Sequence, residues 1–217
     1  MIGNSDEAKG YRRALVRAAA TLGRRASSRN PSQHNKCVPS LWFVTDPART
    51  PDPIATARSL PRGAAVIYRA FGAPEAEQVA QALRRATARA GLVLLIGADA
   101  GLAYRVGADG VHLPERLTPL CRRLRKAHPR WLITAAAHSH AAIRRAQGLG
   151  LDAILVSAVF PSRSASAHRV LGPVRFEALA HGATIPVIAL GGLNGRTARR
   201  LLGSSAAGLA AVEAFNL

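Results

Sequence analysis

This sequence of 217 residues has little cysteine, few aromatic and acidic side chains, and no long apolar run. Its two cysteines, Cys37 and Cys121, are too few for a disulfide framework and lack the spacing of a metal site, so two reduced thiols are expected. No apolar run reaches the length of a membrane span, and the N-terminus lacks the apolar core of a signal peptide. The sequence therefore predicts a cytoplasmic protein with no membrane segment.

The scarcity of acidic residues leaves a formal net charge of +18, carried almost entirely by arginine. Such a charge is compatible with binding nucleic acid, with preferring phosphorylated ligands, or with a solvated basic surface. Aromatic residues make up 5% of the chain and do not interleave with the arginines as base-stacking platforms do. The pattern thus favours a basic surface over nucleic-acid binding.

From Leu41 onward, short apolar runs alternate with helical patterns, as in a parallel sheet. The expected strands are Leu41–Asp46, Ala64–Ala70, Leu92–Gly97, Gly110–Leu113, Leu132–Ala137, Ala153–Ser157, Val187–Gly191 and Gly208–Ala214. The expected helices are Pro53–Leu60, Pro74–Ala90, Asp99–Val106, Thr118–Ala127, Ser139–Leu149, Pro173–Ala180 and Asn194–Leu202. Eight such strands predict a closed (β/α)8 TIM barrel, with an open doubly wound sheet as the alternative.

The last two expected strands carry the strongest functional signal. The first of them ends on Gly191 and Gly192, and a helix start follows at Asn194. Barrels of this type build phosphate sites after strands seven and eight, where glycine lets the backbone approach an anion. The sequence therefore predicts a phosphorylated small molecule as ligand. By contrast, the repeated turns Val106–Leu113 and Leu149–Ile154 are helix-to-strand connections, and we assign no chemistry to them.

Residues 1–40 differ from the rest and form a basic N-terminal segment ahead of a barrel at 41–217. A helix near Ser5–Arg25 would carry the apolar stripe Leu15, Val16, Ala19 and Leu22, followed by a linker over Ala26–Pro39. Strand eight is expected to end near Ala214, which predicts a truncated eighth outer helix. The N-terminal helix could fill its place, and the alternatives are a partner subunit in a homodimer, an arm swapped between subunits, or a disordered basic tail.

A series of motifs spans residues 41–215, and they read LWFVTD, VGADGVHL, AHSHAAIRRAQGLGLDAILVSAVFPSRS, LGP, PVIALGGLN and GLAAVEAF. Together they resemble the thiamine phosphate synthase/TenI family. The resemblance implies a barrel of thiamine biosynthesis. Its synthases join a pyrimidine pyrophosphate to a thiazole phosphate with Mg²⁺, and its TenI branch aromatises the thiazole phosphate by proton transfer.

The resemblance implies a thiazole-phosphate subsite near the last three strands. The family's Thr-Pro-Thr segment reads Ser162-Arg163-Ser164 here, and the usual serine after strand eight is Glu213, whose carboxylate would repel phosphate unless it points away. The implied phosphate-binding residues are Ser162, Arg163, Ser164, Gly191, Gly192, Val212 and Glu213.

The implied pyrophosphate half is mostly replaced. The family's Gln-x-Arg-x-Lys keeps only Arg69, and the two Mg²⁺-binding aspartates fall on Ala98 and Leu117. Mg²⁺ requires oxygen ligands, so a magnesium cofactor is expected only if Glu115 or another carboxylate substitutes. The family's serine on strand five and its lysine after strand six fall on Ala136 and Ala165.

These residues leave the activity open. Arg69 and His138 are the candidate catalytic residues, since the TenI branch uses a histidine in the segment that matches His138 to move a proton. The alternative for His138 is a solvated residue before a helix capped by Ser139. His112, on strand four, is expected to be a packed core histidine. The function hypotheses are a synthase-type transferase, a thiazole tautomerase-type isomerase, and a phosphate-metabolite binding protein without turnover.

Overall fold

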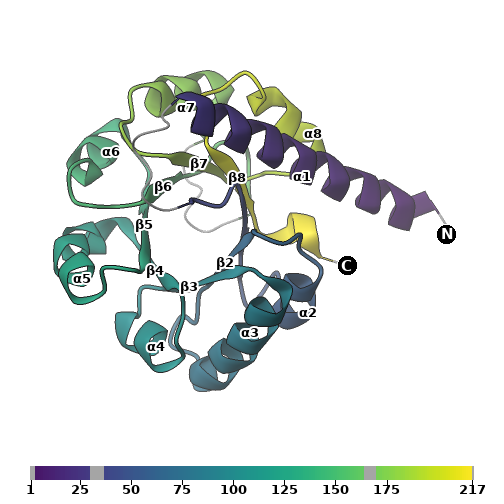
Figure 1. Cartoon of the computed structure of the whole chain (residues 1–217). Helices are drawn as coiled ribbons and strands as arrows, with labels where there is room; N and C mark the ends of the chain where they lie inside the picture. The colour runs from purple at the N-terminus through teal and green to yellow at the C-terminus, as the bar shows by residue number, and fades with distance from the viewer. Residues whose placement is uncertain (1–2, 30–36, 164–169, 217) are drawn as a thin grey trace.

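The computed structural model describes residues 3–29, 37–163 and 170–216, and in that part of the chain it forms a closed barrel. All eight described strands run parallel, each beside its neighbours in sequence, with β8 closing onto β1 (Figure 1). The strands are β1 (Leu41–Val44), β2 (Ala65–Tyr68), β3 (Val93–Gly97), β4 (Gly110–Leu113), β5 (Leu132–Ala137), β6 (Ala153–Val156), β7 (Val187–Leu190) and β8 (Gly208–Ala211). The predicted TIM barrel is confirmed.

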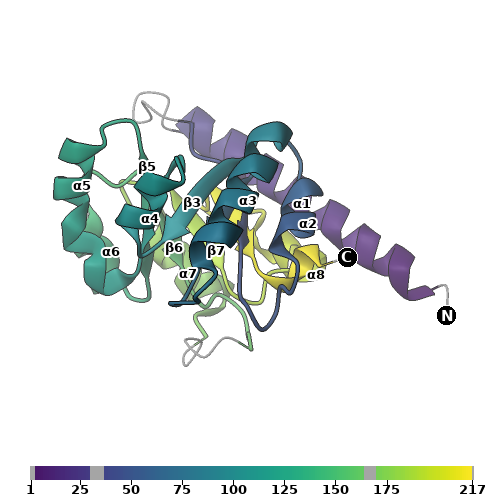
Figure 2. The same ribbon diagram turned by 90° about the horizontal axis from the view of Figure 1, so that it is seen from below.

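Helices surround this barrel on its outside (Figures 1 and 2). The α-helices are α1 (Gly3–Arg29), α2 (Pro53–Arg58), α3 (Ala76–Ala90), α4 (Ala100–Arg105), α5 (Cys121–Ala127), α6 (His140–Ala146), α7 (Gly172–His181) and α8 (Gly195–Ala198). The 3-10 helices are η1 (Glu115–Leu120), η2 (Arg199–Leu201) and η3 (Glu213–Phe215). No helix in the described ranges is both long and apolar enough to cross a membrane.

Alternation along the strands divides the apolar side chains into two cores, because successive residues of a strand face opposite sides. One set fills the inside of the barrel, with Trp42, Ile67 and Leu155 among its members. The other set, which includes Phe43, Val66 and Ile154, packs between the strands and the helices. The strands themselves read as nearly continuous apolar runs because both of their faces are buried.

The helix α1 lies along the outside of the barrel beside α8 (Figure 1). Its side chains Leu15, Ala18, Ala19 and Leu22 are at most 4% exposed and belong to the outer core. Its spacing of three and four residues between buried positions gives the helix one apolar face. The predicted stripe is therefore confirmed, with Val16 partly buried at its edge.

Polar contacts fix α1 to the elements on both of its sides. On one side the Arg196 guanidinium donates to the Tyr11 hydroxyl at 2.6 Å. Gly195 of α8 also lies against the Tyr11 backbone, and a Cβ added to Gly195 would lie 2.3 Å from the Tyr11 carbonyl oxygen. On the other side Arg12 donates to the carbonyl of Ser59, which ends α2. The helix thus spans the outer groove between β8 and β1 on its own barrel.

Two details of the N-terminal segment differ from expectation. The helix continues to Arg29, so the first four residues of the predicted linker Ala26–Pro39 are helical. In this extension the hydroxyls of Ser27 and Ser28 donate to the carbonyls of Gly23 and Arg25, so both side chains are satisfied within the helix. The separation into segments 1–40 and 41–217, and the homodimer, stay predictions.

The repeated helix-to-strand turns are structural, as predicted. Asp109 accepts a hydrogen bond from the Leu94 amide at 2.8 Å, and Asp152 accepts one from the Ile133 amide at 2.7 Å. Each carboxylate also pairs with an arginine, Arg84 or Arg125. These aspartates therefore satisfy backbone donors at the strand starts, at the end of the barrel where β-strands begin.

Candidate functional site

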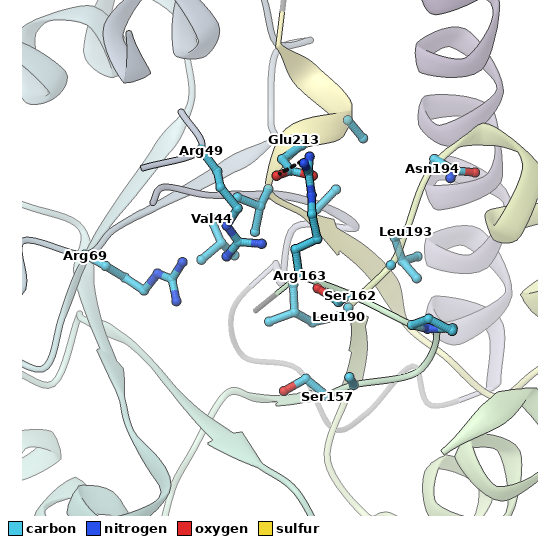
Figure 3. Close-up of a pocket in the computed structure, with 17 residues that line it drawn as sticks. Val44, Arg49, Arg69, Ser157, Ser162, Arg163, Leu190, Leu193, Asn194 and Glu213 are labelled. Carbon is cyan, nitrogen blue, oxygen red and sulfur yellow. Dashed lines mark hydrogen bonds and ion pairs between the residues drawn. The ribbon is translucent and has the colours of Figure 1, made fainter. Parts of the chain in front are cut away.

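A cavity of about 640 Å³ opens at the carboxyl ends of the strands, where barrels of this kind carry their sites. Its walls come from the ends of β1, β2, β6, β7 and β8 and from the segments that follow them (Figure 3). The lining residues are Val44, Arg49, Arg69, Ser157, Ala158, Pro161, Ser162, Arg163, Leu190, Gly191, Gly192, Leu193, Asn194, Ala211, Val212, Glu213 and Ala214.

Two glycines after β7 form one wall in a conformation that only glycine adopts readily. Gly191 has φ +98° and Gly192 has φ +64°, both in the left-handed region. A Cβ on Gly191 would lie 2.8 Å from the Ala158 Cα, and one on Gly192 would lie 2.4 Å from the Pro161 carbonyl oxygen. The backbone after β7 therefore packs directly on the segment after β6, and both glycines line the cavity.

The cavity mouth carries an ion pair across two segments that are distant in sequence. An Arg163 Nη2 donates to the Glu213 Oε1 at 3.0 Å, with the arginine side chain 82% exposed and the glutamate 33% exposed (Figure 3). Glu213 thus lines the cavity, but its charge is offset by Arg163 instead of standing alone. Ser162 also lines the cavity, while Ser164 lies outside the described residues.

The segment after β8 turns at once into the short helix η3, with Val212 before it and Glu213 as its first residue. The N–H groups of a first helical turn have no carbonyl partner within the helix. Both residues line the cavity, and their predicted contact with a phosphate stays a prediction.

Three charged side chains meet on the opposite wall, after β1 and β2. The Asp46 Oδ2 accepts from the Arg49 Nη2 at 2.9 Å and from the Arg69 Nη2 at 3.1 Å. The Arg69 Nε also donates to the Thr45 carbonyl at 2.7 Å. The hydrogen bond from Arg49 is the main reason that the pKa of Asp46 lies below its usual value, while burial lowers the pKa of the Arg69 guanidinium.

His138 lies beside the cavity without lining it. Its side chain is exposed, and its Nδ1 is 3.0 Å from the Ser157 carbonyl oxygen and 3.3 Å from the Ser157 hydroxyl. Ser157 itself lines the cavity. Ser139 caps α6 by accepting a hydrogen bond from the Ala142 amide. His138 therefore occupies an exposed position directly before a capped helix.

The two positions to which the resemblance assigns magnesium ligands hold the apolar side chains Ala98 and Leu117. Ala98 has φ +66°, and Leu117 is partly buried against the outer core. The carboxylate of Glu115 accepts from the His138 amide at 3.1 Å and from Arg145 at 3.2 Å, so its two oxygens already have partners. Among the described residues no group of three or more His, Cys, Asp or Glu side chains is placed to hold a metal ion.

His112 is a buried barrel residue, as expected. It is 9% exposed, and its Nδ1 lies 2.9 Å from the Thr134 hydroxyl on the neighbouring strand. Burial, with a smaller contribution from the charge of Arg69, lowers the pKa of His112 from 6.5 to about 3. The imidazole is therefore neutral at physiological pH.

This burial predicts a specific acid sensitivity. The unfolded chain binds a proton on His112 at pH values where the folded chain does not. The contribution of neutral His112 to the free energy of unfolding is therefore fully present above pH 6.5 and is lost as the pH falls toward 3. Between pH 7.5 and pH 5 the wild-type protein should lose about 2 kcal/mol more free energy of unfolding than His112→Gln does. Urea denaturation at the two pH values measures this difference, and equal losses in both proteins would contradict it.

Sequence reasoning missed Asp46 and Arg49. Both directly follow β1, in the segment Asp46-Pro-Ala-Arg49. Charged residues immediately after a strand of a predicted barrel lie at the end where barrel sites form, so their position was the available signal. Sequence reasoning did select Arg69, which directly follows β2, and the structure brings all three side chains together.

Comparisons with known proteins agree on the barrel. A family model described as thiamine monophosphate synthase matches residues 41–215. A thiamine-phosphate synthase of Thioalkalivibrio sulfidiphilus is 33% identical over 181 residues, spanning 80% of this chain and 85% of the relative. One of Haloquadratum walsbyi is 31% identical over 141 residues, spanning 64% of this chain and 63% of the relative. The solved structure of a thiamine phosphate pyrophosphorylase from Pyrococcus furiosus matches with a TM-score of 0.70 at 28% identity, covering 80% of this chain and 85% of that one.

Proposed function

Because this chain belongs to the thiamine monophosphate synthase/TenI family of thiamine biosynthesis, we propose that its cavity binds a thiazole phosphate while the magnesium and pyrophosphate half of the family site is degenerate. The phosphate group would lie between the segments after β6, β7 and β8. Its binding residues would be Ser162, Arg163, Ser164, Gly191, Gly192, Val212 and Glu213.

The observation that carries this proposal is the close packing of Gly191 and Gly192 on the segment that bears Ser162 and Arg163. Positive φ values and the absence of side chains bring backbone within reach of an anion. Arg163 adds a guanidinium at the same cavity mouth. On ligand binding this guanidinium would release Glu213 and donate to the ligand phosphate instead.

The degenerate half rests on the chemistry of three side chains. Ala98 and Leu117 offer no oxygen to a cation, and Glu115 is engaged by Arg145 and the His138 amide. Mg²⁺ keeps oxygen ligands in near-ideal octahedral geometry. We therefore assign this chain no step through a magnesium ion.

Two alternatives share the thiazole-phosphate cavity. A tautomerase-type isomerase is supported by the contact of the His138 Nδ1 with the Ser157 carbonyl, since a neutral imidazole donating there leaves its other nitrogen as a base. A binding protein without turnover needs only the phosphate subsite. A synthase-type transferase would need another source of charge for the pyrophosphate leaving group.

Calorimetric titration with the thiazole phosphate tests the proposal. We expect binding that Arg163→Gln weakens about tenfold or more, because a charge-assisted hydrogen bond is lost. Arg175→Gln, an exposed arginine on α7, removes the same charge elsewhere and should bind as the wild type does. Equal affinity in both variants, or no binding at millimolar ligand, would reject the phosphate site.

Turnover assays on the same samples separate the alternatives. Pyrophosphate release from a pyrimidine pyrophosphate and the thiazole phosphate with Mg²⁺ would contradict the degeneracy. Proton exchange into the thiazole that His138→Ala abolishes would support the isomerase. Binding of the thiazole phosphate with neither reaction would support the binding protein without turnover.

A further inference from the structure

Three aromatic rings form a row on the outside of the barrel, at the end where its strands begin. Tyr104 lies in the last turn of α4, and His128 and Trp131 lie between α5 and β5. The His128 ring stacks on that of Trp131, with the ring centroids 3.7 Å apart and an angle of 10° between the planes. The centroid of the Tyr104 ring follows at 5.8 Å from that of His128. This aromatic row therefore joins the neighbouring helices α4 and α5 (Figure 1), at the end of the barrel opposite the cavity.

Most of the Tyr104 side chain is open to solvent. Tyr104 is 70% exposed, while His128 and Trp131 are partly buried. Trp131 packs against the outer core, so the aromatic row rests on the barrel wall. A flat ring that stacked on Tyr104 would remove apolar surface from water and form the contact that aromatic pairs prefer. The aromatic row thus fits a ligand that carries planar aromatic groups.

Exposed basic side chains without acidic partners lie along α5 and in the segment after it. In the part of the chain that the structure describes, four of them form no ion pair with an acidic side chain: Arg122, Arg123, Lys126 and Arg130. Lys126 follows Arg123 by three residues and Arg122 by four, so these three share one face of α5. Like charges at this spacing repel one another, and an anionic chain along the same face would offset that repulsion.

We propose that this end of the barrel binds single-stranded nucleic acid, with an unpaired base stacked on the Tyr104 ring and the phosphate backbone along the basic face of α5. Surfaces that bind single strands combine these two elements, a positively charged track and aromatic rings on which bases stack. Along the chain the aromatic residues do not alternate with the arginines, and it is the packing of α4 beside α5 that places Tyr104 against His128, two residues after Lys126. A lipid surface fits less well, because a helix that lies on a membrane inserts an apolar face, and the outer face of α5 is charged.

This inference goes beyond the proposed function and concerns a different surface of the protein. It assigns a partner to part of the net charge of +18, which a single small ligand in the cavity does not require. The two proposals can therefore fail separately.

Fluorescence anisotropy with labelled oligothymidylate and oligouridylate, each of about 12 nucleotides, tests the role of the aromatic row. Tyr104→Ala should weaken the binding of both probes about fivefold or more, because base stacking is lost. Tyr104→Phe keeps the ring and should bind as the wild type does. Phe71→Ala is the matched control, since Phe71 is 69% exposed but follows β2 at the opposite end of the barrel. It should leave the affinity unchanged.

The salt dependence of the same binding tests the basic face. The affinity should fall as the salt concentration rises, because bound counterions are released from the phosphates. Arg123→Gln should lower the slope of log affinity against log salt by about 0.7, which corresponds to one phosphate contact on a single strand. Arg175→Gln, an exposed arginine on α7, removes the same charge elsewhere and should keep the wild-type slope.

Four results would overturn the inference: no oligonucleotide binding at low salt, equal losses of affinity in Tyr104→Ala and Phe71→Ala, equal changes of slope in the two arginine variants, or binding to phosphatidylserine vesicles without binding to the oligonucleotides. If Tyr104→Ala does not fold, Tyr104→Leu replaces it and should also weaken binding, because leucine has no aromatic face. Tyr104→Ala should still bind the thiazole phosphate as the wild type does, and a parallel loss of both ligands would mean that the variant disturbs the whole barrel and would contradict a local role of Tyr104.

Discussion

Deletion of residues 1–36 is expected to leave a barrel that does not fold cooperatively at 25 °C. The helix α1 covers the outer groove between β8 and β1, with Leu15 and Leu22 fully buried against the barrel. Each such leucine contributes about 1.5–3 kcal/mol through burial alone, and the barrel surface beneath the helix would become exposed as well. Domains are stable by only about 5–15 kcal/mol, so this loss is comparable with the whole stability.

Point variants separate this packing effect from the loss of a charged segment. Leu15→Ala is expected to lower the free energy of unfolding by about 2–5 kcal/mol, because it leaves a cavity in a packed interface. Arg24→Ala, on the exposed side of the same helix, should change it by less than about 0.5 kcal/mol. Urea denaturation followed by tryptophan fluorescence measures both. A truncated protein with the wild-type melting temperature would show that α1 does not complete the barrel.

Gly192→Ala is expected to destabilise the protein by about 2–5 kcal/mol and to remove thiazole phosphate binding. The new Cβ would lie 2.4 Å from the Pro161 carbonyl oxygen and 2.8 Å from the Phe160 Cβ, on a backbone with φ +64°. The segment after β6 must then move away, and it carries Ser162 and Arg163 of the proposed phosphate subsite.

Gly203→Ala is the control for this variant, because a Cβ there meets no atom within 4 Å and its φ is not in the left-handed region. Its stability should stay within about 1 kcal/mol of the wild type. Thermal unfolding and titration with the thiazole phosphate give the two readouts. Unchanged affinity in a folded Gly192→Ala protein would mean that the phosphate lies elsewhere in the cavity.

The features predicted correctly from the sequence are those that depend on neighbours along the chain. The limits of β4 and β5 were predicted to the residue, and the other strands within three residues at either end. The glycine pair after β7 and the cap at Asn194 were also recognised, since left-handed backbone and helix starts have strong local residue preferences. These signals come from backbone geometry, which acts over a few residues.

Side-chain contacts between segments that are distant along the chain were not predicted from the sequence. The ion pair of Arg163 with Glu213 joins residues 50 positions apart, so the glutamate appeared to be an isolated carboxylate beside a phosphate. Asp46 and Arg69 are 23 positions apart, and nothing in either segment shows that they share a cavity wall. Such contacts form only when the sheet assembles and brings the carboxyl ends of its strands to one rim, those of the paired strands β1 and β2 in one case and of the non-adjacent β6 and β8 in the other.

The sequence by itself predicted a parallel sheet, because short apolar runs separated by helical patterns are buried on both faces, and the count of eight strands favoured the closed barrel over an open sheet. It also determined that α1 has an apolar face, since Leu15, Ala19 and Leu22 recur at helical spacing. Only the tertiary structure decided what that face covers and which charges meet at the cavity. Helical spacing specifies a surface to be buried without specifying its partner, and the partner is set by the three-dimensional closure of β8 on β1.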